Sequence, residues 1–233
     1  TIPFDSTEVY FPAHAMATAI MITTSFMMLL AIIAVRINKR TEQIEIVITS
    51  LAATVEARDP YTKGHCERIS QLACTIGEKM GLSNKHVEAL RLGGYLHDVG
   101  KVGVPDAVLL KPGKLSSEER ILMMKHATIG HSIVKPMKSM QIVSDIVRWH
   151  HEKLDGSGYP DGLEKENIPI TTQIISVVDV YDALRTERPY KKAYAIDKCH
   201  AILTEESKKG WWNPEVVRIL IETTSAHSQN NLY

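Results

Sequence analysis

Cysteine, net charge and internal repeats are scarce or absent in this 233-residue chain. The three cysteines, Cys66, Cys74 and Cys199, have no metal-knuckle spacing and leave an odd thiol, so we expect reduced, cytoplasmic thiols and no disulfide framework. The 27 basic and 27 acidic residues cancel, and without a broad positive field we expect no binding to a DNA or RNA polymer. A local basic pocket for one anionic ligand is still allowed. No repeat or low-complexity segment is present.

Charge is also missing from residues 15–35, a run dense in Met, Ile, Leu and Ala. A helix of that length spans a hydrocarbon core of about 30 Å. The preceding residues 1–14 contain no Lys or Arg, which disfavours a signal peptide, whereas Arg36, Lys39 and Arg40 follow the run. We therefore predict a transmembrane helix over 15–35 that inserts in the lipid bilayer of the inner membrane. By the positive-inside rule, residues 1–14 are extracytoplasmic and the rest of this single-pass protein is cytoplasmic. A buried core helix is the alternative.

Hydrophobic spacing then predicts a juxtamembrane connecting helix over 36–58. Apolar residues recur at three- and four-residue spacing within 41–58, at Ile44, Val47, Ile48, Leu51 and Val55. Such a stripe permits a homodimer through the 41–58 helix, although it is too short to establish a coiled coil. Asp59-Pro60 ends the helix. The chain begins with Thr rather than Met, and its sequence leaves open whether it is a fragment of a longer sensor protein.

The remaining residues predict further helices and short loops, and hence an all-α fold. One helix runs from about Thr62 to Met80, and the next is capped by Ser83 and delivers His97-Asp98 at its end. A loop is expected over 104–114. The later helix starts are expected at a Ser116–Glu119 capping box, at Ser139 or Ser144, at Pro169 as first helical residue, at Asp197 and at Asn213-Pro214. The apolar helix after Pro169 is expected to be buried on most sides.

The adjacent His97 and Asp98 can supply a nitrogen to one metal ion and two carboxylate oxygens that bridge neighbouring ions. An isolated pair of this kind is also common at an ordinary capped helix end. The candidate ligands along the chain are His65, His97, Asp98, His126, His150, His151 and Asp179. Each has a structural alternative: His65 can cap a helix, His126 can be a half-buried core histidine, and His150-His151 can interact with a helix dipole. One shared explanation is simpler, because nitrogen and carboxylate ligands without thiolate suit iron, manganese or zinc, and this number suits two ions.

Four motifs resemble the HD-GYP domain, a branch of the HD phosphohydrolase superfamily. They are Ala57-Arg58-Asp59-Pro60-Tyr61-Thr62-Lys63-Gly64-His65, then His97-Asp98-Val99-Gly100-Lys101, then Lys111-Pro112-Gly113-Lys114-Leu115, then His150-His151-Glu152-Lys153-Leu154-Asp155-Gly156-Ser157-Gly158-Tyr159-Pro160. The resemblance continues through residues 179–184 and 188–193 and covers a domain at about 45–222, which leaves a C-terminal tail at 223–233. It implies an HD-type helical bundle around a metal site that hydrolyses the bacterial second messenger cyclic di-GMP.

The resemblance also implies roles for particular residues. One metal would be bound by His65, His97, Asp98 and Asp179, and a second by His126, His150 and His151, with Asp98 as the bridge. Asp98 and Lys101 would be catalytic, with Lys101 near the scissile phosphate. Tyr159, Arg188 and Lys191 match substrate-contacting positions. Iron or manganese is expected as the divalent metal.

Three departures from the family pattern stand out. Tyr61 replaces the glutamate of members with a third metal, so two ions and linear pGpG as product are expected, with further cleavage to GMP left open. Gln173 replaces a frequent arginine, and Trp211-Trp212-Asn213 replaces a more usual Phe-Asp. The alternatives to a cyclic di-GMP phosphodiesterase are a non-catalytic cyclic di-GMP receptor in signal transduction and a hydrolase of another cyclic dinucleotide.

Overall fold

The computed structural model describes residues 13–59, 64–187 and 192–230. The chain divides into two compact units, residues 1–47 and residues 48–233. Within the described ranges the secondary structure is helical and contains no β-strand, apart from one isolated bridge between Asp155 and Glu164. The predicted all-α fold is therefore confirmed. The three cysteines are free, as expected.

The first unit contains most of helix α1, which runs from Ala13 to Arg58 without interruption. The predicted apolar run and connecting helix thus belong to one continuous helix. The large apolar side chains of this unit are exposed, among them Met21, Ile22 and Met28. By length and composition, α1 is the one helix among the described residues that is apolar enough to cross a membrane.

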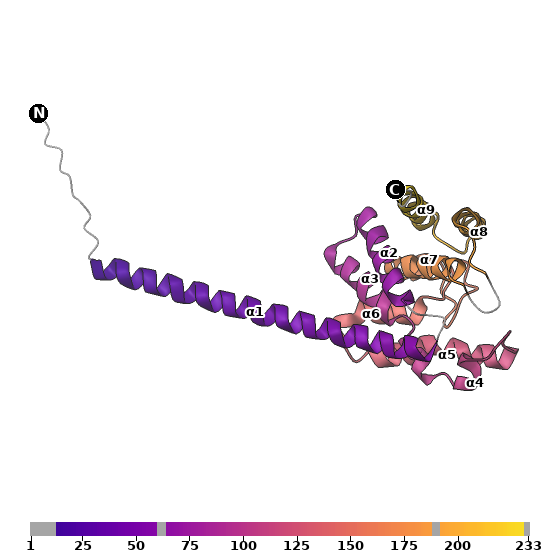
Figure 1. Ribbon diagram of the computed structural model, residues 1–233, viewed down its shortest axis with the longest axis horizontal. Helices are drawn as coiled ribbons and strands as arrows, with labels where there is room; N and C mark the ends of the chain where they lie inside the picture. Colours follow the sequence, from indigo (N-terminus) through magenta and orange to yellow (C-terminus); the bar gives the residue numbers. More distant parts are fainter. Residues whose placement is uncertain (1–12, 60–63, 188–191, 231–233) are drawn as a thin grey trace, which may run out of the picture. The chain divides into compact units, whose positions relative to one another are not determined.

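The second unit consists of the end of α1 and the remaining helices (Figure 1). The α-helices are α2 (His65–Lys79), α3 (Asn84–Leu96), α4 (Asp106–Leu109), α5 (Ser117–Val134), α6 (Gln141–Trp149), α7 (Ile170–Arg185), α8 (Ile196–Lys208) and α9 (Pro214–Asn230). Short 3-10 helices lie between them: η1 (Val99–Gly103), η2 (Lys138–Met140) and η3 (Lys165–Asn167).

Helix α7 forms the centre of the main hydrophobic core. It packs against α2, α3, α6, α8 and α9, and its residues Ile174, Ile175, Val177 and Val178 are fully buried. Its apolar run therefore forms a helix buried on most sides, as predicted, and not a strand. The neighbouring α2 contributes Ile69, Ala73 and Ile76, whose helical spacing places them on one face.

A second cluster holds the end of α1 against the domain. Ile48 is 5% exposed and packs with residues of α3 and α6, including Ala89 and Val143. Ile48 and Val55 belong to the apolar stripe predicted over 41–58, so part of that stripe packs within the chain's own domain. A homodimer through the rest of the stripe stays a prediction.

Several helix starts differ from the predictions. The expected loop over 104–114 contains the short helix α4. Helix α6 starts at Gln141, and neither Ser139 nor Ser144 caps it, because the 3-10 turn η2 leads directly into the helix.

The capping box is confirmed: the Ser116 hydroxyl accepts from the Glu119 N–H, and the Glu119 carboxylate accepts from the Ser116 N–H.

Two departures from the family pattern contact each other. The Asn213 Nδ2 donates to the Gln173 Oε1 at 2.8 Å, and the Gln173 Nε2 donates to the Ile168 carbonyl at 2.7 Å. Asn213 also caps α9, because its Oδ1 accepts from the Glu215 N–H at 2.9 Å. Both amides are thus used in joining α7 to the start of α9.

Candidate metal centre

His97 lies directly after α3, and its side chain is fully buried. Its Nδ1 lies 2.9 Å from the Gly94 carbonyl and must donate to it, because a carbonyl oxygen only accepts. The lone pair of the neutral ring is therefore on Nε2. Within the described part of the chain, Nε2 is one of two buried side-chain atoms without a hydrogen-bond partner. A buried, unpartnered imidazole nitrogen suits a metal ion.

His126 on α5 and His150 at the end of α6 are oriented in the same way. Their Nδ1 atoms donate to the Met123 carbonyl at 2.7 Å and to the Val147 carbonyl at 3.0 Å. The two Nε2 lone pairs then face each other across 3.2 Å. Two neutral acceptors cannot hydrogen-bond to each other, and a shared cation would relieve their repulsion.

The ligand atoms form two groups, each compact enough for one metal ion. His65, His97 and Asp98 make one group, and His126, His150 and His151 make the other, with the atoms of each within 4.8 Å of one another. Asp98 faces both groups. Its Oδ2 lies 3.4 Å from the His97 Nε2, and its Oδ1 lies 3.5 Å from the His126 Nε2. The two oxygens of one carboxylate thus point to two different groups.

Glycine at position 100 permits this approach. A Cβ added to Gly100 would lie 1.9 Å from the His126 carbonyl oxygen and 2.4 Å from the Gly130 nitrogen. Since η1 packs on α5 at this point, only glycine lets the segment after Asp98 come close to the helix that carries His126.

Asp179 on α7 joins the first group, because its Oδ1 lies 3.5 Å from the His65 Nε2. The structure therefore brings together the seven predicted ligands from five places in the chain: the start of α2, the end of α3, α5, the end of α6, and α7. These seven residues supply nitrogen and carboxylate oxygen, the ligand types that iron and manganese accept.

The charge states of Asp98, His150 and His151 in the metal-free chain suit ligation, whereas His97 would have to lose a proton. Burial and neighbouring imidazoles lower the pKa of His150, and they lower that of His151 to about 3. Burial acts to raise the pKa of Asp98, but Lys101 and His97 together hold it well below its usual value. Burial acts to lower the pKa of His97, but the Asp98 carboxylate outweighs burial and raises this pKa to about 9. At neutral pH the metal-free chain therefore has an ionised Asp98, a protonated His97, and neutral His150 and His151, and a metal ion bound by His97 would displace its proton.

The Lys101 side chain contacts Asp98, the residue predicted to bridge the two metal ions. Its Nζ lies 2.8 Å from the Asp98 Oδ2 and 3.3 Å from the Asp59 Oδ2. Burial acts to lower the pKa of the ammonium group, but these two carboxylates outweigh it and raise the pKa. Lys101 is therefore a fixed cation beside the ligands.

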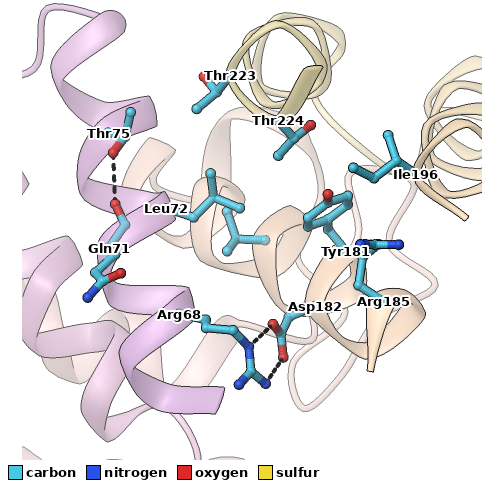
Figure 2. Close-up of a pocket in the computed structure, with 11 residues that line it drawn as sticks. Arg68, Gln71, Leu72, Thr75, Tyr181, Asp182, Arg185, Ile196, Thr223 and Thr224 are labelled. Carbon is cyan, nitrogen blue, oxygen red and sulfur yellow. Dashed lines mark hydrogen bonds and ion pairs between the residues drawn. The ribbon is translucent and has the colours of Figure 1, made fainter. Parts of the chain in front are cut away.

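Asp182 is a functional candidate that the sequence analysis did not select. Its Oδ2 accepts from the His65 Nδ1 at 2.7 Å, which leaves the His65 Nε2 directed to Asp98 and Asp179. Arg68 holds the same carboxylate with two hydrogen bonds, at 2.6 and 2.9 Å (Figure 2). Burial acts to raise the pKa of Asp182, but His65 and Arg68 hold it well below its usual value. The available signal was the three-residue spacing from Asp179, which places both carboxylates on one side of a buried helix.

Glu152 is a second functional candidate that the sequence analysis did not select. Its side chain is 1% exposed and accepts from three loop N–H groups, those of Asp161 at 2.7 Å, Gly162 at 3.1 Å and Leu163 at 3.0 Å. The loop between them carries Tyr159, whose ring stacks on His151 with centroids 4.7 Å apart. Glu152 therefore holds the Tyr159 loop against the second ligand group.

A cavity of about 520 Å³ opens over the metal ligands. Its polar side contains His65, Asp98, Lys101 and Asp179, and Tyr159 also lines it. Its apolar lining comes from Val108 and Leu109 of α4, from Leu115 in the following segment, and from Met123 of α5. This volume lies within the range of about 300–1,000 Å³ that small-molecule sites occupy. The predicted substrate contacts Arg188 and Lys191, and Tyr61, lie outside the described residues.

A separate cavity of about 460 Å³ lies between α2, α7, α8 and α9 (Figure 2). Its lining includes Arg68, Asp182, Arg185 and Tyr181. It contains none of the predicted metal ligands.

Comparison with known proteins places these features in a family. A family profile described as HD domain matches residues 27–216. The chain is 41% identical over 168 residues to the cyclic di-GMP phosphodiesterase response regulator RpfG of Xanthomonas campestris, covering 71% of this chain and 44% of that protein. It is 39% identical over 162 residues to the 3'3'-cGAMP-specific phosphodiesterase 3 of Vibrio cholerae, covering 70% of this chain and 35% of that protein. The chain thus spans less than half the length of these relatives.

Solved structures share the fold. Bd1817, described as an HDG"Y"P protein from Bdellovibrio bacteriovorus, matches with a TM-score of 0.59 at 24% identity, over 69% of this chain and 51% of that chain. The HD domain of the Listeria monocytogenes phosphodiesterase PgpH matches with a TM-score of 0.56 at 18% identity, over 78% of this chain and 99% of that chain. The chain therefore belongs to the HD domain family and is of the HD-GYP type.

Proposed function

We propose that this protein is a metal-dependent phosphodiesterase that hydrolyses cyclic di-GMP to linear pGpG in bacterial signalling. The observation that carries the proposal is the position of Asp98, whose two oxygens face two separate groups of metal ligands. Relatives named cyclic di-GMP phosphodiesterases support the substrate class.

The ligand roles are part of the proposal. His65, His97, Asp98 and Asp179 hold one divalent ion, His126, His150 and His151 hold a second, and Asp98 bridges them. Iron and manganese are the proposed metals. When bound, two such ions supply a water of lowered pKa and Lewis-acid stabilisation of the phosphoryl oxygens. The chain's own part is to present the neutral imidazoles of His150 and His151 and the ionised carboxylate of Asp98, and to exclude bulk water with the apolar lining of the cavity.

The protein side chains around the ligands position the substrate. Lys101 is a charged donor that stabilises negative charge developing on a phosphoryl oxygen. Tyr159 offers a ring face for stacking on a base, and Arg188 and Lys191 grip phosphate oxygens. Hydrolysis adds water across one phosphodiester bond: the phosphate keeps the new oxygen, and the leaving ribose oxygen takes a proton.

A different cyclic dinucleotide is the second candidate substrate. It is favoured by relatives named 3'3'-cGAMP-specific phosphodiesterases and by a matching structure of PgpH in complex with cyclic di-AMP. A non-catalytic receptor is the weaker alternative, because all seven predicted ligands are present.

The proposed location is the inner membrane, with residues 15–35 as a single span and the domain at 45–222 in the cytoplasm. The exposed apolar side chains of α1, and the basic residues Arg36 and Lys39 that follow the apolar run 15–35 within this helix, support this arrangement. A homodimer through the 41–58 helix belongs to the same proposal.

The test uses the full chain in detergent with Mn²⁺ or Fe²⁺ and equal concentrations of cyclic di-GMP, 3'3'-cGAMP and cyclic di-AMP. Chromatography should show pGpG forming fastest. Faster cleavage of another dinucleotide would replace the substrate, and tight binding without any linear product would refute the enzyme proposal in favour of the receptor.

A further inference from the structure

The last turn of α1 contacts the two segments that position His65 and Lys101. Glu56 and Arg58 make these contacts, and both side chains are half-buried. Both residues lie in the unit that begins at Ile48 and contains the candidate metal centre. Neither is a metal ligand in the arrangement described above.

Glu56 caps helix α2 from outside that helix. The N-cap residue Gly64 has no side chain to cap with, yet the first N–H groups of a helix need acceptors. The Glu56 carboxylate supplies them: Oε2 accepts from the Gly64 N–H at 3.0 Å, and Oε1 accepts from the Cys66 N–H at 2.8 Å. His65 is the residue between these two amides. A carboxylate at a helix N-terminus is also favoured by the helix dipole.

Arg58 holds the segment that carries Lys101. Its Nη1 donates to the carbonyls of Lys101 at 3.2 Å and Val102 at 2.9 Å, and its Nη2 donates to the Val104 carbonyl at 3.2 Å. Nη2 also pairs with the Asp106 carboxylate at 2.6 Å. One planar guanidinium therefore binds three backbone carbonyls, two within η1 and one at the residue that follows it, an arrangement that a lysine ammonium cannot reproduce.

We propose that Glu56 and Arg58 are positioning residues for the reaction: Glu56 fixes the metal ligand His65, and Arg58 fixes the cation Lys101. The proposal rests on the proposed phosphodiesterase function for the meaning of Lys101. It assigns the two residues separate consequences. Loss of the Glu56 contacts weakens metal binding, whereas loss of the Arg58 contacts slows the chemical step with the metals still bound.

The experiment compares Glu56→Gln and Arg58→Lys in the full chain. Both substitutions approximately keep the length of the side chain. Glu56→Gln removes the negative charge and one acceptor oxygen, and Arg58→Lys removes the planar guanidinium with its several N–H donors. Hydrogen exchange in the metal-free chain should rise at the amides of 64–66 in Glu56→Gln and over 99–104 in Arg58→Lys. Equilibrium dialysis should show Mn²⁺ affinity about tenfold weaker in Glu56→Gln and within threefold of the parent in Arg58→Lys. With Mn²⁺ saturating, Arg58→Lys should lower kcat about tenfold with KM nearly unchanged.

Matched controls are Glu78→Gln and Arg218→Lys, which alter exposed residues of α2 and α9. Both controls should retain the parent's Mn²⁺ affinity and kcat. Unchanged hydrogen exchange at the amides of 64–66 in Glu56→Gln would overturn the proposal. The proposal would also be overturned if both test variants lost Mn²⁺ affinity equally and only in proportion to their fall in Tm. If the parent binds Mn²⁺ but cleaves no cyclic dinucleotide, the proposed function fails. The exchange and dialysis results then still decide whether Glu56 and Arg58 act separately.

Discussion

Replacing Glu152 by glutamine should destabilise the domain although the side chain keeps its shape. The carboxylate accepts two N–H groups at Oε1, from Asp161 and Gly162, and one at Oε2, from Leu163. Glutamine has one acceptor oxygen, so its NH₂ group would face at least one of these N–H donors. A hydrogen bond to a charged acceptor contributes roughly 1.5–3 kcal/mol, and a buried unpaired donor costs about 1–3 kcal/mol. We therefore expect a loss of about 3 kcal/mol in the free energy of unfolding.

The assay is urea unfolding of the metal-free chain, with thermal unfolding as a second measure. For a domain of this size, 3 kcal/mol corresponds to a fall in Tm of roughly 6–12 °C. Because the same loop carries Tyr159, KM for the substrate should rise as well. Glu78→Gln on the exposed side of α2 is the control, with an expected change below about 0.5 kcal/mol. A loss in Glu152→Gln below about 1 kcal/mol would refute the reasoning that this carboxylate holds the loop.

Three further predictions follow from the site. Asp182→Asn should weaken Mn²⁺ affinity about 10–100-fold in equilibrium dialysis, because His65 loses its charged partner; an unchanged affinity would contradict this role. Gly158→Ala should prevent the loop from closing and abolish cleavage, since its Cβ would lie 2.4 Å from the Glu152 Cα. Gly81→Ala is strained by its φ of 71° but has open space around the Cβ, so it should keep activity. In the metal-free chain, His150 and His151 have lowered pKa values, so below pH 6.5 the unfolded state gains protons that the folded state does not. Unfolding free energy should then fall by about 2 kcal/mol from pH 6.5 to 5.5 in urea titrations, and a constant value would contradict the burial of neutral histidines.

Much of the fold could be predicted because the signals are local. The serine-to-glutamate spacing at Ser116 and the apolar run after Pro169 both produced the expected helical features. Where the prediction was wrong, the cause was also local: α4 is only one turn long, and the 3-10 turn η2 displaces the start of α6 past Ser139. Short segments of this kind carry little periodicity.

The candidate site could also be predicted only in part from the sequence. Histidine and aspartate motifs suggested its ligands, and the structure brings these residues together, although their metal roles are still predictions. The supporting residues were not selected, because the contacts that define their roles join distant parts of the chain; for Asp182 the spacing from Asp179 indicated a shared helix face but not the partner His65. Asp182 meets His65 across 117 positions, and Arg58 meets η1 across more than 40. Sequence spacing does not reveal which buried carboxylate orients a ligand.

The role of Asp98 is tested most directly by one measurement: cyclic di-GMP turnover by Asp98→Ala at saturating Mn²⁺, relative to the parent chain. This substitution removes both oxygens that face the two ligand groups, so we predict a fall in kcat of roughly 10³-fold, which corresponds to about 4 kcal/mol of lost transition-state stabilisation. Turnover at the parent's rate would contradict the account, because no centre bridged by Asp98 could then carry the reaction.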